Sequence, residues 1–141
     1  MIDKKLLEFK IRTQKIRNTL KNLNGLKILE ISEIPFDFKI LKKSGYYADQ
    51  KIPNSKISIY SKASDLYDWI IQCLQLEDGK ILFLLLDSFP IKVKILSVEI
   101  AVKNLWQARE ITILDAQQTI LFEICCDSRD EQHYLFDFYD L

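Results

Sequence analysis

The 141-residue chain predicts an α+β fold, in which a mainly antiparallel sheet ends in a three-strand meander and carries about three helices. Three observations predict this class. Apolar and acidic residues alternate through three strand-like runs between 109 and 141, a continuous apolar run spans 81–86, and apolar residues recur at helical spacing between 4 and 23. The length supports one hydrophobic core, so we expect a single domain over residues 1–141.

The N-terminal third predicts a basic helix from about Lys4 to Leu23, ended by Asn24-Gly25, and then a strand from Leu26 to Ile31. The segment Ser44 to Lys56 contains glycine, proline and asparagine and predicts a long surface loop. Its adjacent tyrosines, Tyr46 and Tyr47, either face a partner or pack against the sheet.

The central third predicts a short strand at 57–60, then a helix that reaches about Leu76 and is capped by Ser61 or Ser64. The apolar run 81–86 is typical of a strand covered on both faces, which places it at the centre of the sheet. After Ser88 and a proline, apolar residues at intervals of four and three from Ile91 to Leu105 favour a helix packed lengthwise on that sheet. Part of this segment, 98–102, also fits a strand.

The C-terminal meander predicts strands around 111–113, 120–126 and 134–138, with Tyr134, Phe136 and Phe138 facing inward. A tight turn near Ala116-Gln117 would set Ile113 opposite Ile120 and Glu110 opposite Glu123. Pairing of Cys126 with Tyr134 would add Asp137 to the same row. The sequence therefore predicts three carboxylates in line across three strands.

A row of like charges costs roughly several tenths of a kcal/mol per pair, so something should offset it. One explanation is a lysine or arginine of the N-terminal half that folds over this face. The other is a cationic partner, drawn by the acidic surface and an aromatic anchor. The candidate partner-binding residues are Glu110, Glu123, Asp127, Asp130, Glu131, Tyr134, Asp137 and Tyr139.

The net charge is zero but unevenly distributed, with 13 Lys/Arg against 6 Asp/Glu in residues 1–60 and 2 against 8 in residues 107–141. The basic N-terminal helix either presents a solvated face or binds acidic partners or membranes. Its excess positive charge is also compatible with a stripe that binds nucleic acid, although no nucleic-acid-binding motif supports that interpretation. No apolar run approaches the roughly 20 residues of a membrane span, and the N-terminus is charged where a signal peptide is apolar, so we expect a cytosolic protein.

Neither catalysis nor a cofactor is indicated. Of the three cysteines, Cys125 and Cys126 are adjacent and point to opposite faces of a strand, which predicts reduced, structural thiols. The single histidine, His133, either makes a loop hydrogen bond or senses pH, and no nucleophile accompanies it. We expect no metal site, although three carboxylates in a row could bind a divalent ion, which remains a weaker alternative.

The segments "KILFLLLDS", "NLWQAREITILD" and "QQTILFEICCDSRDEQHYLFDFYDL", with a tryptophan-bearing helix before them, resemble in architecture the small immunity proteins of bacterial polymorphic and contact-dependent toxin systems. The resemblance implies a cytosolic antidote that binds one toxin domain tightly, usually a basic one, and has no catalysis of its own. The basic N-terminal helix departs from that pattern, which leaves open whether the meander or the helix meets the partner.

Two alternatives from other classes remain. A small metal-dependent nuclease would use the carboxylate row, and an adaptor or secretion chaperone would bind its client through the helices. An exposed edge of the meander would also allow a homodimer.

Overall fold

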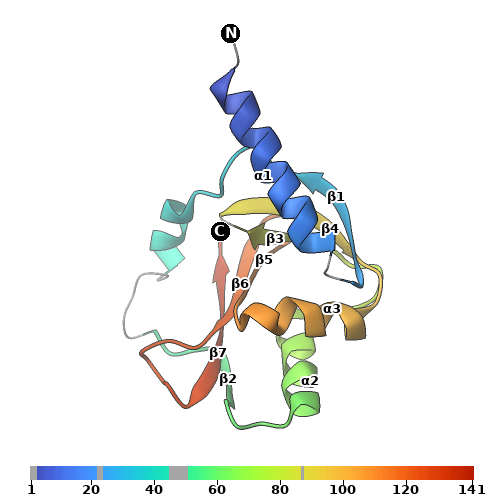
Figure 1. The fold of residues 1–141 in the computed structure, drawn as a ribbon. Coiled ribbons are helices and arrows are strands. Elements are labelled where there is room, and N and C mark those ends of the chain that lie inside the picture. The colour runs from blue at the N-terminus through green and yellow to red at the C-terminus, as the bar shows by residue number, and fades with distance from the viewer. Residues whose placement is uncertain (1–2, 22–23, 45–50, 87) are drawn as a thin grey trace.

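The computed structural model describes residues 3–21, 24–44, 51–86 and 88–141. It confirms the α+β class: among these residues, three α-helices accompany a seven-stranded antiparallel sheet whose last three strands in sequence form a meander (Figure 1). The strands, in their order across the sheet, are β1 (Leu26–Ile31), β4 (Phe89–Ile95), β3 (Ile81–Leu86), β5 (Ile111–Asp115), β6 (Ile120–Cys125), β7 (His133–Asp140) and β2 (Ser55–Ser58).

All three helices pack on one face of this sheet. They are α1 (Lys4–Lys21), α2 (Ala63–Leu74) and α3 (Val98–Leu105). Each helix contributes apolar side chains spaced about one turn apart, such as Ile16 and Leu20 of α1 and Ile70 and Leu74 of α2. These side chains meet every second residue of the strands, including Val93 of β4, and form the main core.

The opposite face of the sheet carries a second, smaller apolar cluster. Leu114, Leu121 and Tyr139, on three neighbouring strands, pack with Leu41 of a 3₁₀ helix, η1 (Phe38–Ser44). Phe36 and Phe38 extend the cover with their rings in an edge-on contact. Both faces of the sheet are therefore covered, which the alternating pattern of the meander does not predict.

The helix predicted from Ile91 to Leu105 is wrong over its first half. Residues 89–95 form strand β4, which pairs with β3 and with β1. Ser88, with φ of 68°, lies in the tight turn between β3 and β4 rather than at a helix start. The helix begins only after Ser97, whose Oγ accepts a hydrogen bond from the Ile100 N–H at 3.5 Å.

The predicted bounds of the other helices and strands differ less from the observed ones. Strand Leu26–Ile31 is confirmed, whereas α2 begins after Lys62, so neither Ser61 nor Ser64 is its N-cap. The strand expected at 57–60 lies at Ser55–Ser58. The predicted end of α1 at Leu23 and the tyrosines Tyr46 and Tyr47 lie outside the described residues.

The outer edge of the meander is not exposed, because β2 pairs along β7. The two edges of the sheet are β1 and β2, and β1 carries a shift of register between Ile28 and Glu30. Within the described residues, none of the helices combines the length and apolarity needed to cross a membrane.

Candidate functional site

The predicted row of three carboxylates contains only two. Glu123 of β6 lies opposite Asp137 of β7, as expected, but its partner on β5 is Thr112 rather than Glu110. Ile113 correspondingly lies opposite Phe122, two residues beyond the predicted partner Ile120.

A longer turn between β5 and β6 causes this shift. The carboxylate of Asp115 accepts hydrogen bonds from the N–H groups of Thr119 (2.6 Å) and Ile120 (2.9 Å), and Gln118 adopts a left-handed φ of 55°. A four-residue turn at 116–119 replaces the tight turn at Ala116-Gln117. The Asp115 side chain is the sequence signal for such a turn.

Asp137 is fully buried and is neutralised by two basic side chains. Lys51 Nζ lies 2.8 Å from Oδ1, and Arg129 Nη2 lies 2.6 Å from Oδ2. Arg129 also binds Asp127 Oδ2 at 2.9 Å and donates to the carbonyl oxygen of Lys51 at 3.1 Å. The explanation that a basic residue of the N-terminal half covers the acidic face is thus confirmed for Lys51, and Arg129 supplies the second charge.

We name Lys51, Asp127, Arg129 and Asp137 the carboxylate clamp. Hydrogen bonds to Asp137 and Asp127 raise the pKa of Arg129, so its positive charge is secure at any physiological pH. The pKa of Asp127 is lowered by its hydrogen bonds from Arg129, which outweigh the opposite effect of burial. The clamp joins the loop after β6 and the segment before β2 to β7.

The two candidate aromatic anchors are also buried. Tyr134 is 7% exposed, packs edge-on against Trp106 and accepts a hydrogen bond from Arg109 Nη1 at 3.3 Å. Tyr139 is 4% exposed and lies in the second apolar cluster, with Lys51 Nζ 4.9 Å from its ring centroid. The expectation that Tyr139 presents an outward aromatic contact is wrong, because η1 covers that face.

Of the remaining acidic candidates, Asp130 also has basic side chains beside it. Asp130 Oδ2 lies 2.9 Å from Nδ1 of His133, the first residue of β7, and 3.6 Å from Nζ of Lys56. Glu123 is half-buried, whereas Glu110 and Glu131 are exposed. The acidic surface at this end of the sheet is therefore narrower than its sequence indicates.

No group of three metal-ligating side chains occurs within the part of the chain that the structure describes. Burial raises the pKa of the Cys73 thiol to about 11 and that of Cys125 to about 12, the latter also through the nearby Glu123 and Asp127. Both thiols are protonated at neutral pH and hence weak nucleophiles and metal ligands.

Helix α1 presents the opposite situation. Six of its side chains from Lys4 to Arg17 are basic, and Glu8 is the one acidic residue among them. Over the described residues, none of these six cations lies within 4.0 Å of a carboxylate; the Lys and Arg ion pairs there belong to Lys51, Lys56 and Arg129. The sequence already predicts that this helix is basic, but only the structure shows that its basic side chains have no ion pair.

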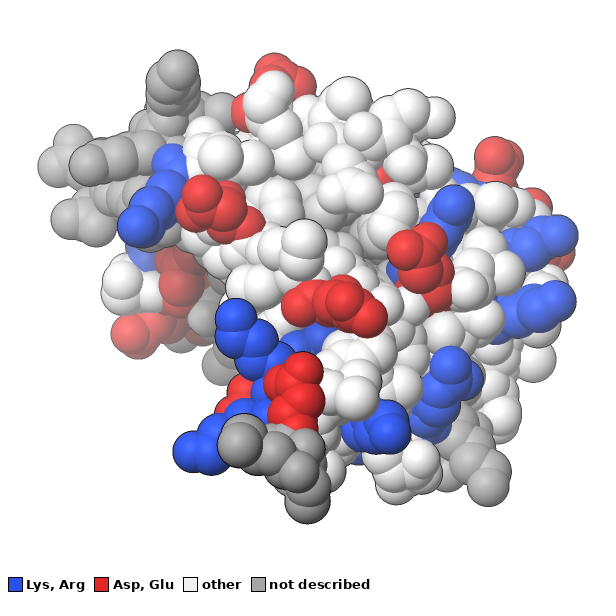
Figure 2. Space-filling model, turned by 90° about the horizontal axis from the view of Figure 1, so that it is seen from above, with Lys and Arg blue, Asp and Glu red and all other residues white. Residues whose placement is uncertain are grey.

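The N-terminal half of α1 also exposes large apolar side chains. Leu7 and Ile11, one turn apart, are 44% and 60% exposed, and Leu6 is 50% exposed. Figure 1 shows the reason, since this end of α1 projects beyond the sheet. Seen from that end, basic and acidic side chains are interspersed, with the basic ones gathered toward the right and lower sides of the view (Figure 2).

Comparisons of the chain with protein families, with characterised proteins and with solved structures found no match. The fold by itself defines an antiparallel α+β protein. Among its described residues, the buried Asp137 of the meander is paired with Lys51 and Arg129, whereas the basic side chains of α1 have no ion pair.

Proposed function

We propose that the protein is a cytosolic, non-catalytic binding protein that captures another protein through helix α1, and that this capture neutralises a toxin domain in the manner of an immunity protein. The observation that carries the proposal is the contrast in charge pairing. In the meander, Asp127, Asp130 and Asp137 find basic partners within the fold, whereas the exposed cations of α1 find none among the described residues.

This contrast favours α1 over the meander as the contact surface. Three of the predicted contacts, Tyr134, Asp137 and Tyr139, are buried and cannot touch a partner without unfolding part of the sheet. In α1, the exposed pair Leu7 and Ile11 supplies apolar area beside the basic side chains. Apolar area of this kind supplies affinity, and the surrounding charge accelerates association with a surface of opposite sign.

The sign of the charge changes the expected partner. A basic toxin domain would meet repulsion from α1, whereas an acidic surface would be attracted to it. We therefore propose an acidic partner surface in place of the basic one expected from the meander. Glu110 and Glu131 are then peripheral, and their replacement should leave capture intact.

The nuclease alternative receives no support from the geometry. Glu110 does not lie in the row with Glu123, and both oxygens of Asp137 are held by Lys51 and Arg129. A divalent cation at Asp137 would have to displace two positive side chains from a fully buried site.

An adaptor or secretion chaperone is the second candidate, because it too would bind through the helices and is favoured by the same unpaired cations of α1. The two candidates differ in what happens to the partner. An antidote abolishes the partner's activity, whereas an adaptor leaves it active after release.

The experiment is a capture assay with the tagged protein in lysate of its native cells at low and high salt. Lys10→Glu/Lys15→Glu on α1 is compared with Lys62→Glu/Lys103→Glu, which makes the same charge change at exposed positions beside α2 and on α3. We expect a stoichiometric protein to be retained by wild type and by the control pair, and to be lost from the α1 pair.

Equal retention by both pairs, or loss only when Glu110 and Glu131 are reversed to lysine, would refute α1 as the contact. Expression of the captured protein alone and together with the chain then separates the two candidates. Growth arrest that the wild-type chain relieves identifies an antidote, and a partner harmless in both cases identifies an adaptor.

A further inference from the structure

We infer that the cleft between α1 and the segment after β1 binds a peptide segment in which a carboxylate stands beside a large apolar side chain. The cleft would give specificity to the partner contact made by α1, so this inference rests on the function proposed above. Its cavity volume is about 420 Å³, which lies within the roughly 300–1,000 Å³ usual for sites that enclose a small group.

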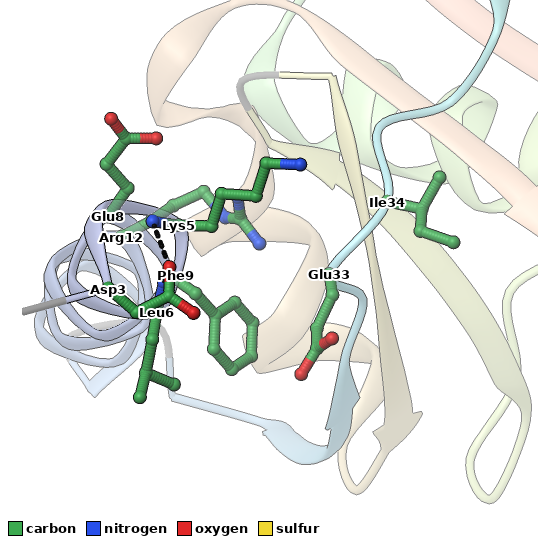
Figure 3. Close-up of a pocket in the computed structure, with 8 residues that line it drawn as sticks. All are labelled: Asp3, Lys5, Leu6, Glu8, Phe9, Arg12, Glu33 and Ile34. Carbon is green, nitrogen blue, oxygen red and sulfur yellow. Dashed lines mark hydrogen bonds between the residues drawn. The ribbon is translucent and has the colours of Figure 1, made fainter.

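The apolar part of the cleft has two walls. Leu6 and Phe9 extend from α1 on one side, and Ile34 stands on the other side, on the chain that leaves β1 (Figure 3). Leu6 is 50% exposed and Ile34 is 74% exposed, while Phe9 is half-buried. A leucine, isoleucine or phenylalanine side chain inserted here would cover apolar surface that now faces water, at about 25 cal/mol per Å².

The cationic part of the cleft is Arg12, which the fold holds in place. Its guanidinium carbon lies 3.5 Å from the ring centroid of Phe89, and its Nη2 donates to the carbonyl oxygen of Ser32 at 2.9 Å. Its Nε is buried without a hydrogen-bond partner in the structure, so stacking, rather than a full set of hydrogen bonds, orients the group.

No carboxylate of the described residues lies within 4.0 Å of Arg12, although three acidic side chains line the same cleft. Asp3 caps α1, its Oδ1 accepting from the N–H of Lys5 at 2.9 Å. The Glu8 carboxylate points away from the cleft, and the Glu33 carboxylate lies below the path of Lys5 (Figure 3). A half-buried guanidinium without an ionic partner favours an incoming carboxylate.

Lys5 reinforces this preference, because its side chain reaches across the mouth of the cleft toward Ile34 (Figure 3). A carboxylate between Lys5 and Arg12 would meet two positive groups, and the adjoining apolar side chain would meet Leu6, Phe9 and Ile34. Nucleic acid would satisfy the charges but not the apolar walls. An acidic peptide segment satisfies both.

The test uses a random nonapeptide library displayed on phage and selected against the full-length chain. We expect the selected peptides to share an aspartate or glutamate next to leucine, isoleucine or phenylalanine. The dissociation constant of the best synthetic peptide is then measured by fluorescence polarisation.

Arg12→Gln should raise the dissociation constant of that peptide by roughly tenfold or more, as expected for the loss of a charge-assisted contact. Lys103→Gln is the matched control, because it removes one positive charge from an exposed helix position outside both the cleft and α1. Ile34→Glu tests the opposite wall at a 74% exposed side chain, and it should weaken binding comparably without disturbing the packing of α1.

Selection of no peptide, selection of basic peptides, or equal affinity of the Arg12→Gln and wild-type chains would overturn the assignment. A single-stranded oligonucleotide that binds better than the selected peptide would also overturn it. Because the selection needs no native partner, its result is independent of the capture assay. If the cleft proves not to bind peptides, the contact proposed above through the outer side chains of α1, Lys10 and Lys15, would still stand.

Discussion

Replacement of Arg129 by methionine keeps much of the side chain's apolar length but removes both of its ion pairs. Asp137 is 0% exposed, and Lys51, whose Nζ lies 2.8 Å from its Oδ1, would be the remaining cation of the clamp. Removing one partner of a buried pair usually costs about 3–5 kcal/mol, because a buried charge is left uncompensated. Lys51 still offsets part of that charge, so we expect a loss of about 2–3 kcal/mol in the free energy of unfolding.

The assay is urea unfolding at pH 7 followed by tryptophan fluorescence. The midpoint should fall while the slope stays constant, since a change in slope would indicate an altered unfolded state rather than a lost interaction. Arg109→Met is the matched control. Arg109 is exposed and makes a 3.3 Å hydrogen bond to Tyr134, so its replacement should cost roughly 0.5 kcal/mol or less.

A double-mutant cycle between Arg129→Met and Asp137→Asn isolates the pair itself. The two changes should be strongly non-additive, with a coupling of about 1 kcal/mol or more, because the substituted amide no longer carries the charge that Arg129 neutralises. Additive effects, or an Arg129→Met variant as stable as the Arg109→Met control, would refute the view that the clamp stabilises this end of the sheet.

Two further predictions concern the same fold. The pKa of Asp127 is lower in the folded protein than in the unfolded chain, so its contribution to stability is fully present above the unfolded value of about 3.9 and is lost as the pH falls through the folded value. When the pH is lowered below about 4, the urea concentration at the unfolding midpoint should therefore decrease, and it should decrease less in Asp127→Asn. An identical dependence of the midpoint on acid pH in that variant would contradict the assignment. Gly25→Ala should destabilise the protein by roughly 2 kcal/mol or more, because φ is 88° and the added Cβ would lie 2.7 Å from the Ala101 nitrogen. Gly79→Ala, at φ of 85° with nothing within 4 Å of its Cβ, is the comparison, and thermal unfolding should show a clearly smaller loss for it.

The segment from Ile91 to Leu105 shows why part of the fold could not be predicted. Ile91, Val93 and Ile95 alternate as a strand requires, but Ile91 and Ile95 also fall at helical spacing with Val98 and the residues after it. Because α3 follows β4 directly, the two periods merge into one longer apparent helix. Pairing of β4 with β3 on one side and β1 on the other decides the conformation.

The candidate site shows a similar division. Alternation along β6 and β7 correctly predicted that Glu123 and Asp137 lie opposite each other. It could not predict that Lys51, 86 residues before Asp137, supplies the first of its ion pairs, or that Asp115 lengthens the preceding turn and moves Glu110 out of the row. Such contacts depend on the path of the chain between elements, which local periodicity does not encode.

The sequence by itself determined the α+β class, the C-terminal meander and the strongly basic character of α1, because alternation, helical spacing and charge are local properties of the chain. Only the tertiary structure decided which charges are neutralised within the fold and which face outward. An ion pair requires two side chains to meet across the sheet, so the burial of Asp137 by Lys51 and Arg129, and the unpaired cations of α1, follow from long-range packing.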